Sequence, residues 1–119
     1  MRKTSYTMKG FTLVEIMIVV AIIAILLVIA IPIFTHARET SQKSTCIANL
    51  RLIDCAITSW ALEAHKGVGA DIDTSALFGT TNLLREQPVC PAGGTFLFQT
   101  VGAKPQVACS FSDLGHVLP

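Results

Sequence analysis

Charged residues are scarce in this sequence, in which Asp, Glu, Lys and Arg make up 14% of 119 residues. Soluble domains usually carry about 25%. The first ten residues contain Arg2, Lys3 and Lys9 and no acidic residue, so the rest of the chain holds six basic and eight acidic residues. Because no basic patch is large enough to neutralise many phosphates, nucleic acid is not the expected partner.

The sequence also lacks the motifs of common active sites. It contains no Gly-x-Ser-x-Gly, no His-Glu-x-x-His and no phosphate-binding Gly-x-x-x-x-Gly-Lys. The spacings Cys-x-x-Cys and His-x-x-x-His are absent as well, and His36, His65 and His116 lie far apart in the chain. We therefore expect no enzyme, no metal site and no cofactor.

A long apolar run is the most prominent feature that is present. Residues 16–31 are all apolar, and between Phe11 and Phe34 only Thr12, Glu15 and Pro32 interrupt the pattern. About 20 helical residues cross a bilayer, and the basic residues before the run should stay in the cytoplasm, so the sequence predicts a single membrane span followed by an exported part. A cleaved secretory signal is disfavoured, because the run exceeds the usual 7–15 residues and ends without a small-x-small site.

Two residues within this span require an explanation. A carboxylate such as that of Glu15 costs several kcal/mol near an apolar run unless it lies at the interface or has a partner. Pro32 removes one helical hydrogen bond and clashes with the preceding turn, so we expect the helix to bend near residues 28–32.

The chain resembles type IV prepilins and type II secretion pseudopilins in the segment Lys9-Gly10-Phe11-Thr12-Leu13-Val14-Glu15 and in the apolar run that follows. The resemblance implies that a prepilin peptidase removes residues 1–10 as a leader, cutting between Gly10 and Phe11, and N-methylates Phe11. It also implies that Glu15 pairs with the Phe11 ammonium of a neighbouring subunit, and that Pro32 is a flexible point.

The expected partners follow from the same resemblance. They are other pilin-like subunits in a filament, the peptidase, an assembly platform in the inner membrane and the membrane itself. The expected location is the inner (cytoplasmic) membrane, with the C-terminal domain in the periplasm or outside the cell, and a filament after assembly.

The remaining chain predicts a small α+β head. Residues 35–66 contain no Gly or Pro, and apolar residues at helical spacing form one stripe that should pack the domain; Gly67 and Gly69 should end the helix. Short helical turns are expected around residues 76–78 and 82–84, and residues 95–101 and 106–111 predict an antiparallel hairpin, with a third short strand near residue 119 as an option. The stripe consists of Cys46, Leu50, Ile53, Ile57, Trp60 and Ala64.

The predicted fold is therefore pilin-like, with one long N-terminal helix packed on a small antiparallel hairpin or sheet. Its parts are a leader (1–10), a transmembrane and assembly helix (11–34) and a head (35–119). A second resemblance, to a subgroup of small bacterial prepilin-like proteins, also implies a small pilin-like head. It involves Cys46, Asn49-Leu50, Ile53-Asp54, Trp60-Ala61-Leu62-Glu63, Cys90-Pro91-Ala92-Gly93-Gly94-Thr95, Cys109-Ser110 and Gly115-His116-Val117-Leu118-Pro119.

Four cysteines in an exported domain suggest disulfide chemistry. Cys46 and Cys55 would lie about 13.5 Å apart along a helix and on opposite faces, which excludes a bond between them. Cys90 and Cys109 flank the predicted hairpin and are the favoured pair. A bond from Cys46 to either of them is the alternative, and the states of Cys46 and Cys55 stay open.

Two functions are consistent with these features. The favoured function is a structural subunit of a type IV pilus-like or type II secretion pseudopilus filament, and the processing segment does not distinguish between the two. The alternative is a membrane-anchored periplasmic binding module that forms no filament, which would require a cleft and no contribution from Glu15. A third function, DNA uptake, predicts a basic surface that the sequence does not show.

Overall fold

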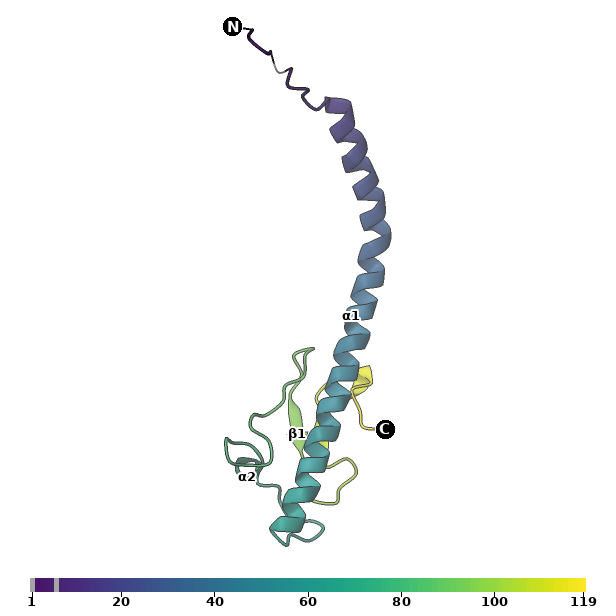
Figure 1. Cartoon of the computed structure of the whole chain (residues 1–119). Coiled ribbons are helices and arrows are strands. Elements are labelled where there is room, and N and C mark those ends of the chain that lie inside the picture. The colour runs from purple at the N-terminus through teal and green to yellow at the C-terminus, as the bar shows by residue number, and fades with distance from the viewer. Residues whose placement is uncertain (1, 6) are drawn as a thin grey trace. The chain divides into compact units, whose positions relative to one another are not determined.

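The computed structural model describes residues 2–5 and 7–119 and consists of two compact units, one ending at His36 and one comprising Ala37–Pro119 (Figure 1). Its elements are, in chain order, α1 (Leu13–Glu63), α2 (Thr74–Leu77), β1 (Phe96–Phe98), β2 (Val107–Cys109) and the 3-10 helix η1 (Ser112–Leu114). The predicted α+β class, with a long N-terminal helix and a small antiparallel sheet, is confirmed.

The first unit contains the apolar part of α1. Its large apolar side chains are exposed on every side of the helix, from Phe11 (87% exposed) through Ile23 (50%) to Phe34 (68%). Among the described residues, α1 is the one helix that is long and apolar enough to cross a membrane. This unit buries none of that apolar surface within itself, so lipid or other helices must cover it.

The second unit has its core along one stripe of α1. The predicted stripe is confirmed for Cys46, Leu50, Ile53, Ile57 and Trp60, all of which are buried. It is wrong at Ala64, which is exposed because α1 ends at Glu63; Ala61 is buried instead. The stripe belongs to one core with Leu77, Cys90, Val101, Val107 and Cys109.

The C-terminal end of α1 differs in detail from the prediction. The Lys66 N–H donates to the Ala61 carbonyl at 2.8 Å, and His65 between them adopts a positive φ of 53°. This is the hydrogen-bond pattern of a helix C-cap that usually places glycine in the left-handed position. The helix therefore ends at Glu63, and His65 takes the left-handed position that was expected of a glycine.

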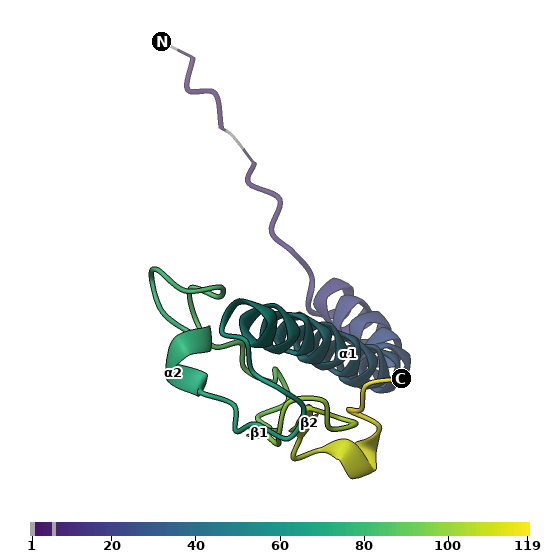
Figure 2. The ribbon, with the colours of Figure 1, turned by 90° about the horizontal axis from the view of Figure 1, so that it is seen from below.

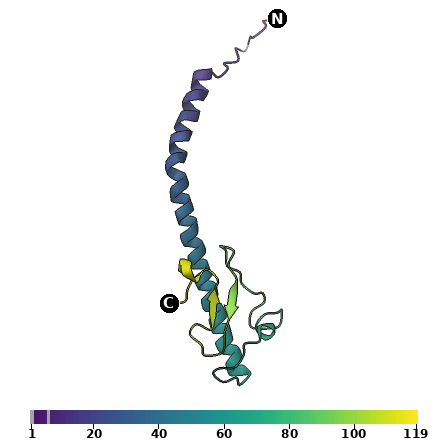
Figure 3. The ribbon, with the colours of Figure 1, turned by 180° about the vertical axis from the view of Figure 1, so that it is seen from behind.

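The expected hairpin is present, with shorter strands than predicted. β1 and β2 pair antiparallel, with Phe96 opposite Cys109 and Phe98 opposite Val107. The optional third strand near the C-terminal end is absent from residues 110–119, where the chain forms η1 (Ser112–Leu114) instead. Outside the hairpin, Asp71 makes an isolated antiparallel bridge to Thr100. Figure 3 shows the two strands side by side next to α1.

The other elements of the second unit all lie on one side of its part of α1 (Figure 2). The helical turn expected around residues 76–78 is present as α2, which Asp73 caps by accepting the Ser75 N–H at 3.0 Å. That hydrogen bond and the Ser75 hydroxyl lower the pKa of the Asp73 carboxyl. The turn expected around residues 82–84 is not helical, because Leu84 instead pairs with Phe78 in a parallel bridge.

Candidate functional site

Residues 7–12 lead into α1 without regular secondary structure, and they include the bond predicted to be cut. Gly10 and Phe11 are exposed, and a Cβ atom placed on Gly10 would meet no heavy atom within 4 Å. The Gly10–Phe11 bond is therefore open to a protease. Cleavage there and methylation of Phe11 stay predictions.

Glu15 has a structural role that was not anticipated from the sequence. Its carboxylate Oε2 accepts the Thr12 N–H at 2.9 Å, and its own N–H donates to Thr12 Oγ1 at 3.3 Å. The pattern Thr-x-x-Glu at the start of a helix is a capping box, and that spacing was visible in the sequence. The helix begins at Leu13 because Thr12 and Glu15 satisfy each other's orphan N–H groups.

This cap leaves the charge of Glu15 without a counter-ion. Within residues 2–5 and 7–119 no cationic group pairs with the Glu15 carboxylate, which accepts only a neutral backbone N–H. Pairing with a Phe11 ammonium is thus a prediction about another copy of the chain.

Pro32 lies inside α1, where the Thr35 hydroxyl donates to the Pro32 carbonyl at 2.9 Å. The bend expected near residues 28–32 stays a prediction.

Three of the four cysteines come together in the second unit. The sulfur atoms of Cys46, Cys90 and Cys109 and a ring nitrogen of His116 all lie within 4.8 Å of one another. Each of these side chains is at most 5% exposed, whereas Cys55 is exposed. We call Cys46, Cys90, Cys109 and His116 the thiol cluster.

Hydrogen bonds from α1 hold the loop that carries Cys90. Asn49 Nδ2 donates to the Val89 carbonyl at 3.1 Å, and Gln42 Nε2 donates to the Pro91 carbonyl at 3.3 Å. The loop then turns tightly, with the Gly93 N–H on the Cys90 carbonyl at 2.9 Å and a positive φ of 92° at Gly93 that favours glycine. Cys90 is thus fixed from both sides against the helix that carries Cys46.

The environment of the thiols differs within the cluster. Burial, and then hydrogen bonding with the Cys90 and Cys109 thiols, raises the pKa of the Cys46 thiol. Burial also acts to raise the pKa of Cys90, but hydrogen bonds from the Cys46 thiol and from the backbone N–H groups of Ala92 and Gly94 outweigh it and lower that pKa. Cys90 is therefore the thiol that ionises most readily in this pair.

All four cysteines are free thiols in the structure. The favoured pairing of Cys90 with Cys109 stays a prediction, and so does the alternative through Cys46, because the cluster brings all three sulfurs into reach. His116 was not predicted to join them. Residues 46, 90, 109 and 116 match no metal spacing and meet only through the fold.

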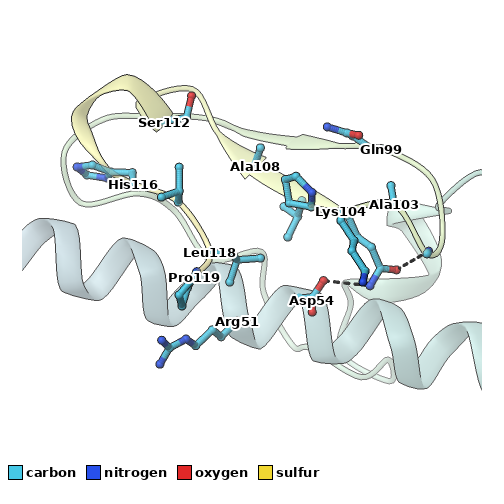
Figure 4. A pocket seen from close by; sticks show the side chains of 15 residues that line it. Arg51, Asp54, Gln99, Ala103, Lys104, Ala108, Ser112, His116, Leu118 and Pro119 are labelled. Carbon is cyan, nitrogen blue, oxygen red and sulfur yellow. Dashed lines mark hydrogen bonds between the residues drawn. The ribbon is translucent and has the colours of Figure 1, made fainter.

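An open groove of about 1010 Å³ runs beside α1 in the second unit (Figure 4). Arg51 and Asp54 lie on its α1 side, and the segment that carries His116 and Leu118 lies on the other side. Gln106 ties the two sides together, because its Nε2 donates to Asp54 Oδ1 at 3.0 Å while its Oε1 accepts the Gly102 N–H at 3.1 Å. The groove is the cleft that a binding module would need.

Comparison with known proteins places the chain in a family. Residues 7–31 match the prokaryotic N-terminal methylation motif. The chain is 36% identical over 85 residues to competence protein ComGC of Bacillus subtilis, covering 71% of this chain and 83% of that protein. It is 32% identical over 93 residues to ComGC of Halalkalibacterium halodurans, covering 78% and 86%.

A longer relative matches less of its own length. The type IV major fimbrial protein FimA of Dichelobacter nodosus is 37% identical over 97 residues, which cover 82% of this chain and 56% of FimA. No solved structure matches the chain. These relatives are named as competence and fimbrial proteins, in line with the expectation of a structural protein.

Proposed function

Because the chain belongs to the type IV prepilin and pseudopilin family, we propose that it is a filament subunit that is cut between Gly10 and Phe11 and assembles through the apolar part of α1. One observation carries the proposal. The first unit exposes apolar side chains on all sides of α1 directly after an accessible Gly10–Phe11 bond. Such a helix needs lipid before assembly and neighbouring subunits after it.

Glu15 would set the register of that assembly. A carboxylate moved into an apolar bundle costs several kcal/mol unless a charge compensates it. Cleavage after Gly10 creates a new ammonium at Phe11, and pairing it with the Glu15 of a neighbour neutralises both charges. The capping box does not compete with this pair, because a carboxylate has acceptor capacity beyond the single N–H of Thr12.

The direction of insertion follows from the basic residues Arg2, Lys3 and Lys9, which should remain in the cytoplasm. The proposal therefore places the apolar part of α1 in the inner membrane and the second unit outside the cytoplasm. The peptidase and the assembly platform would act at that membrane.

We further infer that the filament belongs to a competence-type system rather than to a type II secretion system. The observation that favours this is the match to two proteins named as competence proteins, the two ComGC proteins, of which the chain covers 83% and 86%. Deleting the gene in its native host should lower transformation frequency at least tenfold and leave the secreted proteins unchanged. A normal transformation frequency with lost secretion would assign the filament to secretion instead.

Mass spectrometry of the chain co-expressed with a prepilin peptidase tests the processing step. The mature protein should lack residues 1–10 and carry one methyl group on Phe11. Gly10→Val is the matched control, because open space around Gly10 makes the change structurally silent while the peptidase loses its close approach. An intact Met1 terminus, or cleavage near Ala30, would overturn the filament proposal and leave an anchored binding module.

A further inference from the structure

We propose that the second unit binds one zinc ion as a structural site, through three thiolates and one imidazole of the thiol cluster, those of Cys46, Cys90, Cys109 and His116. Structural zinc sites are tetrahedral and are built from cysteine and histidine ligands. The four ligand atoms lie within 4.8 Å of one another, and all four side chains are buried. This inference is independent of the proposed filament.

The spacing of the ligand atoms fits the metal. Zinc–sulfur bonds of about 2.3 Å and zinc–nitrogen bonds of about 2.0–2.1 Å place the sulfur and nitrogen ligands of a tetrahedron roughly 3.5 Å apart. In the structure Cys90 Sγ lies 3.6 Å from His116 Nδ1. The histidine therefore presents a ring nitrogen to the Cys90 thiol at the distance that a shared zinc ion requires.

The number of ligands favours a metal over a disulfide. A disulfide bond between Cys90 and Cys109 would use two thiols. The Cys46 thiol and the His116 ring would then be buried with neither a covalent cross-link nor a metal bond. The remaining cysteine, Cys55, is exposed and stands outside the cluster. A zinc ion uses all four groups, and its binding releases the three thiol protons to solvent.

The surroundings supply what such a site needs beyond its ligands. Zinc with three thiolates and one imidazole carries one negative charge. The Lys43 ammonium lies against Gly115, the residue before His116. It therefore places a positive charge close to the His116 end of the negatively charged site.

The site would connect four segments of the second unit that are far apart in the sequence. Cys46 lies on α1, Cys90 on a loop, Cys109 at the end of β2, and His116 follows η1. The strands β1 and β2 have only three residues each, which is too little for independent stability. One zinc ion would hold all four segments together.

Zinc analysis of the purified full-length chain in detergent tests the proposal. Wild type should hold one zinc per chain, and Cys90→Ser should fall below about a tenth of that. Cys55→Ser is the matched control, because it removes an exposed cysteine from the same helix as Cys46 and should keep one zinc. His65→Asn controls for His116→Ala in the same way, since His65 is exposed.

A second variant guards against misfolding. His116→Cys replaces the imidazole by a fourth thiolate, so it should keep the metal that His116→Ala loses. With Co²⁺ in place of zinc, its sulfur charge-transfer absorption should rise in proportion to the change from three thiolates to four. Equal cobalt spectra for wild type and His116→Cys would overturn the assignment of His116.

Thiol alkylation under denaturing, non-reducing conditions with a chelator separates zinc from a disulfide. The proposal predicts four alkylated cysteines. A chain with two alkylated cysteines and a bridged peptide, from Cys90 to Cys109 or involving Cys46, would overturn it. A reduced chain that holds no zinc and takes none up from added Zn²⁺ would overturn it as well.

Discussion

The apolar side chains of the two units differ in what covers them. In the unit that ends at His36, Ile23 is 50% exposed and no side chain of its apolar window is buried. In Ala37–Pro119, Leu50, Ile53 and Ile57 on the same helix are fully buried. The first unit depends on molecules outside the chain, while the second depends on its own core, so substitutions in the two should have separable effects.

The largest expected effect is on the core of the second unit. Ile53→Ala should lower the free energy of unfolding by about 2–5 kcal/mol, because it removes a fully buried side chain and leaves a cavity. Ile23→Ala is the control and should leave that unfolding free energy unchanged. Thermal unfolding followed by fluorescence of Trp60, the only tryptophan, measures the second unit alone. Equal effects of the two substitutions would contradict the independence of the units.

Gly94→Ala should have a smaller effect in the same unit. A Cβ atom there would lie 2.8 Å from Cys109 Sγ and 3.0 Å from Phe111 Cδ2, so the thiol cluster must shift. Overpacking of this kind costs about 1–3 kcal/mol. Gly67→Ala is the control, because a Cβ on Gly67 meets nothing within 4 Å. Chemical denaturation of both variants checks this, and an unchanged Gly94→Ala midpoint would show that the packing around Cys109 is loose.

The two units also differ in how much the sequence reveals. The apolar run and the stripe on α1 follow from periodicity, and both were predictable because each lies within a single helix. The thiol cluster was not, because its members come from four segments and meet only when α1, the Cys90 loop and β2 pack together. The capping box of Thr12 and Glu15 is a local pattern that the sequence contains. For Glu15, however, only an ion pair with another chain was predicted, because its charge lies next to the apolar run.

Glu15→Gln should affect the first unit alone, because Glu15 lies in that unit and hydrogen bonds with Thr12 there. Glutamine keeps the capping box, since its side chain also accepts the Thr12 N–H, but it removes the charge that would pair with a Phe11 ammonium. We expect membrane insertion to be intact or improved and filament yield to fall about tenfold, which corresponds to about 1.4 kcal/mol. Unfolding of the second unit should not change.

Thr12→Ala is the matched counterpart, because it removes the hydroxyl that caps Glu15 while keeping the carboxylate. Loss of this cap costs about 1 kcal/mol of local helix stability, and a helix already held by lipid should still assemble. Filament yield and crosslinking at equal membrane abundance compare the two variants. If Thr12→Ala blocks assembly and Glu15→Gln does not, then Glu15 acts as a helix cap alone, and apolar packing of residues 11–34 must drive the filament without an ion pair.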